Sequence, residues 1–257
     1  MGPILEVENV SLQFGGVKAL DNVSYHINEG EIFSLIGPNG AGKTSMLNCI
    51  SGLYQPTSGS IRYKGKDITK MKPYERTSLG IARAFQNIAL FAHMSVLDNI
   101  KLGRHSLMKS GVISGGFYFG KSSKEEIEHR KKVEEVIEFL ELQDIRHTPV
   151  GTLSYGLQKR VEVGRALALN PELILLDEPM AGMNGAEKEM MSHFILEMHE
   201  TMNTTVVLIE HDLGVVMSLS DHIAVLDFGK RIGFGIPKEI RTNPDVIRAY
   251  IGEETVI

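Results

Sequence analysis

The feature that most constrains this chain is a glycine-rich octapeptide at residues 37–44, which reads Gly-Pro-Asn-Gly-Ala-Gly-Lys-Thr. A strand-like run from Glu31 to Ile36 precedes it, and a helix is expected from about Lys43 to Gly52. Glycines let such a loop curl so that several backbone N–H groups point at one anion, and the start of a helix adds partial positive charge. A glycine turn beside a solvated lysine is the ordinary alternative, but the strand and helix around the loop favour an anion-binding loop.

The octapeptide fits the P-loop pattern, which assigns roles to its last residues. Lys43 is expected to reach the β- and γ-phosphates of ATP, and the Thr44 hydroxyl is expected to bind Mg²⁺. The Ser45 hydroxyl is placed to contact the α-phosphate. The predicted nucleotide-binding residues of this segment are Gly37, Pro38, Asn39, Gly40, Ala41, Gly42, Lys43, Thr44 and Ser45.

A second signal is a run of four apolar residues, 173–176, followed by Asp177 and Glu178, which is the Walker B form. If this strand lies beside the P-loop strand, it delivers Asp177 to the Mg²⁺ ion. Glu178 then faces the γ-phosphate, where its carboxylate orients or deprotonates the attacking water. A strand that ends in a charged turn is the alternative, and the P-loop in the same chain favours the functional interpretation.

Short apolar runs alternate with expected helices in the last third of the chain, which predicts a mainly parallel sheet. The expected strands there are 173–176 and 205–209, with a helix at 185–202 between them and a hairpin over 223–234. Earlier strands are expected at 5–14, 23–27 and 82–85, with a hairpin at 60–68. Helices are expected at 95–106, with Ser95 as its N-cap, and at 123–142 and 155–169.

Composition narrows the function classes. The net charge is −5, from 32 acidic and 27 basic residues, which argues against a nucleic-acid surface. The single cysteine, Cys49, cannot form an internal disulfide, so a reducing compartment fits. No apolar run approaches the ~20 residues that a membrane-spanning helix needs. If the protein works at a membrane, another chain must hold it there.

The segment 153–160, Leu-Ser-Tyr-Gly-Leu-Gln-Lys-Arg, resembles the signature of the ABC transporter ATPases, which is usually Leu-Ser-Gly-Gly-Gln. Tyr155 replaces a glycine of that pattern, and Leu157 stands where glutamine is common. Ser154 and Gly156, which carry the phosphate contacts in the family, are both kept. The resemblance therefore implies that these two residues bind nucleotide, while the two departures leave its affinity open.

Other motifs follow in the order that the family has them. Gln86 resembles the Q-loop glutamine, which touches Mg²⁺ or water and couples to the membrane subunits. His211 resembles the switch histidine that contacts the γ-phosphate, and Phe14 stands where an aromatic residue stacks on adenine. The segment 181–184 resembles the D-loop but ends in Asn184, where aspartate is usual.

The resemblance covers about residues 4–252 and implies an α/β P-loop ABC ATPase fold. That fold has a mainly parallel core sheet, an antiparallel β subdomain and a helical signature subdomain. The expected division places the nucleotide-binding core and β subdomain at 4–86 and 161–252, and the helical subdomain at 87–160 with an insert at 108–121. The implied catalytic residues are Lys43, Glu178 and His211, and the implied Mg²⁺ ligands are Thr44, Gln86 and Asp177.

Three weaker features resemble the ATPases of branched-chain amino acid importers: the insert 108–121, the segment 178–184 and the tail 243–254. This subtype implies a peripheral subunit on the cytoplasmic face of the inner membrane. Its implied partners are transmembrane permease subunits, a second ABC ATPase subunit and, indirectly, a solute-binding protein. In the pair, which is either a homodimer or a heterodimer, each ATP lies between the P-loop of one subunit and Ser154 and Gly156 of the other.

Several alternatives remain open at this point. The ATPase could serve another solute, such as urea, other amino acids or aromatic acids, because the membrane subunits and the binding protein choose the solute. A lipopolysaccharide-type exporter shares the general fold. A soluble ABC ATPase of translation or DNA repair is disfavoured because the chain has a single cassette and no coiled-coil insertion or basic arm.

Overall fold

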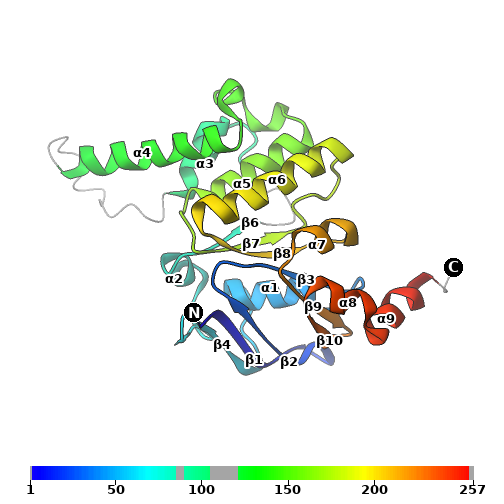
Figure 1. Ribbon diagram of the computed structural model, residues 1–257. Helices are drawn as coiled ribbons and strands as arrows, with labels where there is room; N and C mark the ends of the chain where they lie inside the picture. Colours follow the sequence, from blue (N-terminus) through cyan, green and yellow to red (C-terminus); the bar gives the residue numbers. More distant parts are fainter. Residues whose placement is uncertain (1, 85–89, 105–120, 255–257) are drawn as a thin grey trace.

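The computed structural model describes residues 2–84, 90–104 and 121–254. Gln86 and almost all of the insert 108–121 lie outside these residues, so the predictions made for them stay predictions. None of the helices in the described ranges is long and apolar enough to cross a membrane. Figure 1 shows a central layer of strands with helices on both sides of it.

The central sheet has six strands in the order β10-β9-β3-β8-β7-β6, and all neighbours are parallel except β10 and β9. The predicted mainly parallel sheet is therefore confirmed. Every residue of β3, β7 and β8 is buried, because continuous apolar runs suit strands that are covered on both faces. The strands are β3 (Ile32–Ile36), β6 (Ile81–Ala84), β7 (Leu173–Asp177), β8 (Thr205–Ile209), β9 (His222–Asp227) and β10 (Lys230–Gly235).

The Walker B strand does not lie directly beside the P-loop strand, because β8 lies between β3 and β7. Val206 of β8 is opposite Ile32 on one side and Ile174 on the other. A hydrophobic run shows that a strand is buried but carries no information on which strand pairs with it. Since all three strands are parallel, the P-loop and Asp177 still reach the same edge of the sheet.

A second, antiparallel sheet has the order β2-β1-β4-β5. In Figure 1, helix α1 (Lys43–Ser51) lies between this sheet and the central sheet. A hydrophobic core joins the inner face of this sheet to α1 and to the main sheet, with Phe33, Met46 and Ile61 fully buried in it. This core therefore fixes α1, the helix that leaves the P-loop. The strands are β1 (Pro3–Phe14), β2 (Val17–Asn28), β4 (Ser58–Tyr63) and β5 (Lys66–Asp67).

The helices of the middle third cover the other face of the main sheet (Figure 1). They are α3 (Val96–Gly103), α4 (Lys121–Phe139) and α5 (Tyr155–Leu167), and α6 (Gly185–Met202) lies in the same layer. The predicted N-cap of α3 is confirmed, since the Ser95 hydroxyl accepts a hydrogen bond from Asp98 N at 3.1 Å. Helix α4 ends three residues earlier than expected, and Glu141 follows it with a left-handed φ of 51°.

Four helices were not anticipated from the sequence: α2 (Pro73–Ser78), α7 (Leu213–Leu219), α8 (Pro237–Thr242) and α9 (Pro244–Glu254). Three of them have six or seven residues, which is too short to show a helical period of apolar residues. Proline occupies the first position of α2, α8 and α9, where its missing N–H costs no hydrogen bond. That proline was the available signal.

Candidate nucleotide-binding site

The P-loop connects β3 to α1, in the strand–loop–helix order that phosphate binding requires. Its three glycines all have positive φ: 148° at Gly37, 77° at Gly40 and 102° at Gly42. A Cβ on Gly37 would clash with the carbonyl oxygen of Leu226, and one on Gly42 would lie 2.6 Å from that of Ala19. The nearby backbone of Leu226 and Ala19 therefore admits only glycine at these two positions, which fixes the curl of the loop.

The Lys43 side chain is buried inside this curl. Its Nζ donates hydrogen bonds to the carbonyl oxygens of Gly37 at 2.6 Å and Pro38 at 2.9 Å. Thr44 is exposed in the first turn of α1, and Ser45 is half-buried beside it. A cation and two hydroxyls therefore meet at a helix N-terminus, where backbone N–H groups and the helix dipole favour a phosphate.

Asp177 ends β7 with its side chain only 1% exposed. Its Oδ2 accepts a hydrogen bond from a terminal guanidinium nitrogen of Arg83 at 2.9 Å. Burial raises the pKa of Asp177, and the positive charge of Arg83 opposes that rise. Its Oδ1 is buried and has no hydrogen-bond partner among the described residues.

The unpartnered Oδ1 tests whether this site suits a magnesium ion. Burying a carboxylate oxygen without a partner costs free energy unless a bound ion or water supplies the missing contact. Mg²⁺ is usually held by one or two protein carboxylates and hydroxyls together with substrate phosphates. In the described parts of the chain, no group of three His, Cys, Asp or Glu side chains could hold a metal by itself. The donor set of Asp177 and Thr44 therefore fits Mg²⁺ that arrives with a nucleotide.

Glu178 and His211 contact each other directly. Their Oε1 and Nε2 atoms are 2.7 Å apart, and they follow the neighbouring strands β7 and β8. Glu178 has a left-handed φ of 51°, and its backbone N–H is held by the Ile209 carbonyl oxygen at 2.9 Å. A non-glycine residue in this region is strained by about 1–3 kcal/mol, and such strain clusters at functional sites. The chain thus fixes a carboxylate and an imidazole at the carboxyl ends of the parallel strands, the edge of the sheet at which the P-loop begins.

Phe14 is the last residue of β1, and the residue is 47% exposed. It meets the ring of Tyr54 edge-on, with centroids 5.1 Å apart. Tyr54 follows α1 and was not anticipated as a site residue. An exposed aromatic pair offers a stacking surface for a base.

Ser154 and Gly156 lie at the start of α5. The Ser154 hydroxyl caps the helix by accepting from Leu157 N at 3.4 Å, and the residue is exposed. Gly156 is buried against α6, because a Cβ there would lie 2.5 Å from Oε1 of Glu187. Within this chain, the signature segment therefore packs against α6, which follows the Walker B strand β7.

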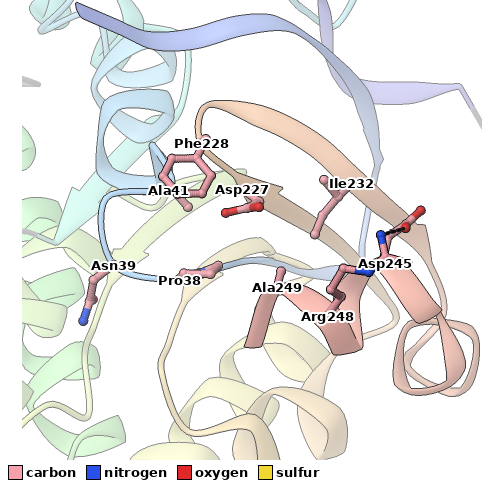
Figure 2. A pocket seen from close by; sticks show the side chains of 9 residues that line it. All are labelled: Pro38, Asn39, Ala41, Asp227, Phe228, Ile232, Asp245, Arg248 and Ala249. Carbon is pink, nitrogen blue, oxygen red and sulfur yellow. Dashed lines mark hydrogen bonds and ion pairs between the residues drawn. The ribbon is translucent and has the colours of Figure 1, made fainter. Parts of the chain in front are cut away.

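A cavity of about 420 Å³ lies beside the P-loop, between the turn after β9 and helix α9 (Figure 2). Figure 2 shows Pro38, Asn39 and Ala41 on one side of it and Arg248 and Ala249 of α9 on the other. Neither Asp177 nor Glu178 lines this cavity.

Comparisons with known proteins agree with this geometry. A family model described as "ABC transporter" matches residues 20–181. The chain is 39% identical to the high-affinity branched-chain amino acid transport ATP-binding protein BraF of Pseudomonas aeruginosa, over 98% of both chains. It is 38% identical to the corresponding protein LivG of Escherichia coli (strain K12), also over 98% of both. The chain belongs to the ABC transporter ATP-binding family.

Further matches support the family. A model described as "Branched-chain amino acid ATP-binding cassette transporter" matches residues 230–256. A nucleotide-free ATP-binding cassette superposes with a TM-score of 0.85 and 36% identity, covering 98% of this chain and all of that one. A dimeric cassette in a post-hydrolysis state, bound to ADP and phosphate, superposes with a TM-score of 0.75 and 29% identity over 91% of this chain and 98% of that one. The protein is an ABC ATPase that binds and hydrolyses ATP.

The structure accounts for two of the three departures of this ABC ATPase from the family pattern, Tyr155 and Asn184. A Cβ on Gly182 would lie 3.3 Å from the Tyr155 ring, so the bulky Tyr155 packs over a residue without a side chain. Asn184 caps α6 by accepting from Glu187 N at 3.0 Å, and the Glu187 carboxylate accepts in return from Asn184 N. Asparagine and aspartate cap helices equally well, so Asn184 preserves the local structure.

Two buried charged residues of the ABC ATPase site were missed from the sequence. Glu210 accepts from the backbone N–H of Met180 at 2.8 Å and of His211 at 3.3 Å, and burial raises its pKa. It thereby ties the segment after Glu178 to the loop that carries His211. Arg83 is the other, as the partner of Asp177. The available signal was a charged residue within or directly after an apolar strand, because a buried charge must be paired.

Proposed function

We propose that this ABC ATPase powers the import of branched-chain amino acids. The observation that carries the proposal is the agreement of two comparisons, one over nearly the whole chain and one over its C-terminal segment. The whole chain matches branched-chain amino acid transport ATP-binding proteins, and residues 230–256 match a family model of the same description. General cassette features such as the P-loop cannot distinguish importers, so the C-terminal match supplies the narrower argument.

In the proposed site, Lys43 and the backbone N–H groups of residues 39–45 bind the β- and γ-phosphates. Phe14 stacks on adenine, and Ser45 contacts the α-phosphate. Thr44, Gln86 and Asp177 hold Mg²⁺, which when bound neutralises charge on the phosphates. The unpartnered Oδ1 of Asp177 supports this assignment.

Glu178 is proposed to orient or deprotonate the water that attacks the γ-phosphate. His211, 2.7 Å from Glu178, holds the carboxylate in place and contacts the γ-phosphate. Glu210 fixes the backbone of both loops, so that carboxylate and imidazole keep their spacing as the nucleotide arrives.

We also infer that the working unit is a pair of such subunits, a homodimer or a heterodimer. Ser154 and Gly156 lie at the N-terminus of the 13-residue helix α5, where free N–H groups favour an anion. In a head-to-tail pair these groups complete the γ-phosphate site of the partner. ATP binding then closes the pair and drives the membrane subunits, and hydrolysis resets it.

The proposed partners are transmembrane permease subunits, contacted from the cytoplasmic face of the inner membrane, and indirectly a solute-binding protein. The proposed division of labour places the nucleotide core at 4–86 and 161–252. The helical subdomain spans 87–160 and contains the insert 108–121, and Gln86, directly before it, is proposed to couple the nucleotide site to the membrane subunits.

The test is uptake of labelled leucine, isoleucine and valine in native cells that carry wild type or Glu178→Gln. The proposal expects the variant to lose uptake of all three, while an unrelated solute enters normally. Normal branched-chain uptake, in cells without a redundant importer, would contradict the solute assignment. Urea, other amino acids and aromatic acids would then be tested in the same way, and lipopolysaccharide export after them.

A further inference from the structure

Arg83 is a buried cation that none of the site assignments uses. It lies in β6, whose register with β7 places it opposite Leu175, two residues before Asp177. Its side chain is 7% exposed. A charged group in such a place is retained only when its partners compensate for lost hydration.

The guanidinium of Arg83 reaches two other elements. One terminal nitrogen donates to Oδ2 of Asp177 at 2.9 Å. The other donates to Oδ1 of Asn48 at 2.6 Å and to Oγ of Ser51 at 3.0 Å. Asn48 and Ser51 belong to α1, the helix that begins at the P-loop. One side chain therefore connects the Walker B strand to the phosphate-binding helix.

This arrangement treats the two oxygens of Asp177 differently. Oδ2 is taken by Arg83, whereas Oδ1 is buried and has no partner among the residues that the structure describes. A planar guanidinium fixed at both ends holds a carboxylate in one orientation, which a flexible ammonium does not. The geometry therefore selects Oδ1 as the oxygen that remains for a metal.

We propose that Arg83 is a positioning residue for Asp177: it holds Oδ2, presents Oδ1 to Mg²⁺, and uses its anchor on α1 to keep that oxygen in register with Thr44. The inference rests on the proposed role of Asp177 as a metal ligand.

The test is equilibrium binding of a fluorescent ATP analogue to the purified full chain, measured with Mg²⁺ and again with EDTA. Arg83→Gln is expected to weaken Mg²⁺-dependent binding about tenfold, the usual effect of removing a residue that orients a metal ligand. Binding in EDTA is expected to change less than about twofold, since the P-loop contacts remain. Equal losses under both conditions, or no loss under either, would overturn the proposal.

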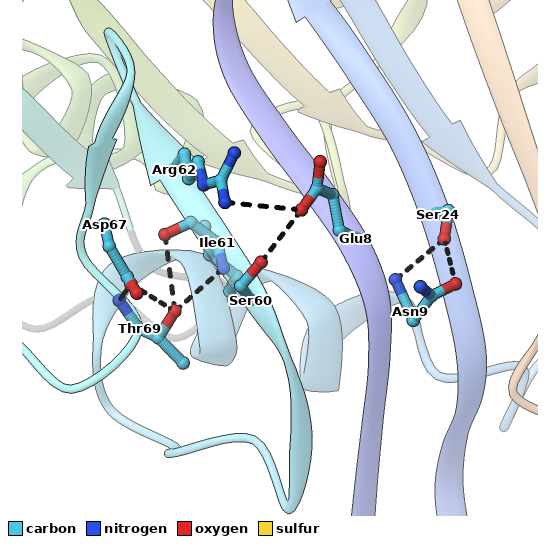
Figure 3. Close-up of polar contacts among 8 residues, drawn as sticks. All are labelled: Glu8, Asn9, Ser24, Ser60, Ile61, Arg62, Asp67 and Thr69. Carbon is cyan, nitrogen blue, oxygen red and sulfur yellow. Dashed lines mark hydrogen bonds and ion pairs between the residues drawn. The ribbon is translucent and has the colours of Figure 1, made fainter.

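Three further variants sharpen the result. Arg83→Lys keeps the charge without the fork and is expected to restore only part of the Mg²⁺ dependence. Asn48→Ala keeps the ion pair and the bond to Ser51 but removes the other anchor on α1, so a smaller selective loss is expected. This variant keeps the proposal testable even if Arg83→Gln does not fold. Arg62→Gln is the control, because Arg62 is half-exposed on β4 and its ion-pair partner there is Glu8, at 3.9 Å (Figure 3).

Asp177→Asn separates the positioning role of Arg83 from the metal-binding role of Asp177 on which it rests. If Asp177→Asn loses Mg²⁺-dependent binding while Arg83→Gln keeps it, the positioning role is wrong and the metal site stands. If Asp177→Asn keeps full Mg²⁺ dependence, the metal role itself is wrong, and the inference falls with it. The proposal survives only when both variants lose the Mg²⁺-dependent part selectively.

Discussion

The P-loop half of the site and the signature half differ in how completely one chain satisfies them. Lys43 is buried and hydrogen-bonded to its own loop, and Gly37 and Gly42 lie against the backbone carbonyls of Leu226 and Ala19. Ser154 is exposed, and its cap on α5 is a long hydrogen bond of 3.4 Å. The first half is organised by its own chain, whereas the second presents donors outward, as a site shared between two chains requires.

Glu178→Gln should give the largest effect, because it removes the proposed base from the organised half. ATP turnover is expected to fall about 10²–10⁴-fold, while ATP binding changes little. The trapped pair should elute as a dimer in ATP during size-exclusion chromatography. Glu189→Gln, an exposed glutamate on α6, is the control. Rapid turnover by Glu178→Gln would remove its catalytic role.

Lys43→Ala is expected to weaken ATP binding about 10–100-fold, the loss of one or two charge-assisted contacts to phosphate. Isothermal titration calorimetry on the single chain measures it, since this half needs no partner. Lys70→Ala changes an exposed lysine of the β subdomain and should bind ATP normally. Unchanged affinity in Lys43→Ala would contradict the phosphate cradle.

Ser154→Asp tests the signature half separately. Aspartate caps helices as well as serine, so α5 should stay folded, but its charge repels a γ-phosphate brought by a second subunit. In the Glu178→Gln background, ATP-driven dimerisation is expected to weaken at least about tenfold. ATP binding to the single chain should be unaffected, and Ser154→Asn serves as the uncharged cap. A matching loss of ATP binding by the monomer would erase the contrast between the halves.

Gly182→Ala probes the packing that connects the two halves. Gly182 has φ 74°, and a Cβ there would press on the Tyr155 ring at 3.3 Å. We expect a loss of about 1–2 kcal/mol in the free energy of unfolding, measured by denaturant titration. Gly185→Ala, where nothing lies within 4 Å, is the matched control. Equal stability of the two variants would show that Tyr155 does not rely on Gly182.

Cys49 should give the smallest effect. It is buried in α1 behind the P-loop, and burial raises the pKa of its thiol to about 12. Only the thiolate reacts, so at pH 8 a maleimide is expected to leave both the thiol and ATP binding unchanged. Modification should begin only as pH rises towards 12 or when the chain unfolds. Fast labelling of the native chain at pH 8, followed by mass spectrometry, would show that α1 opens readily.

The sequence alone identified the elements whose chemistry lies in adjacent residues. The P-loop, Asp177 with Glu178, and the Ser95 cap are set by local backbone geometry, so a short pattern predicts them. The bounds of α6 and β8 matched the predicted ranges for the same reason, because their periodicity or apolar run is continuous.

Only the tertiary structure decided which distant residues meet. Arg83 and Asp177 are 94 positions apart, and Glu210 reaches Met180 across 30. Tyr155 rests on Gly182, and β8 separates the P-loop strand β3 from the Walker B strand β7. Strand order and buried ion pairs depend on how whole layers pack. A hydrophobic run says only that a strand is covered, and a charged residue in it says only that some partner must exist.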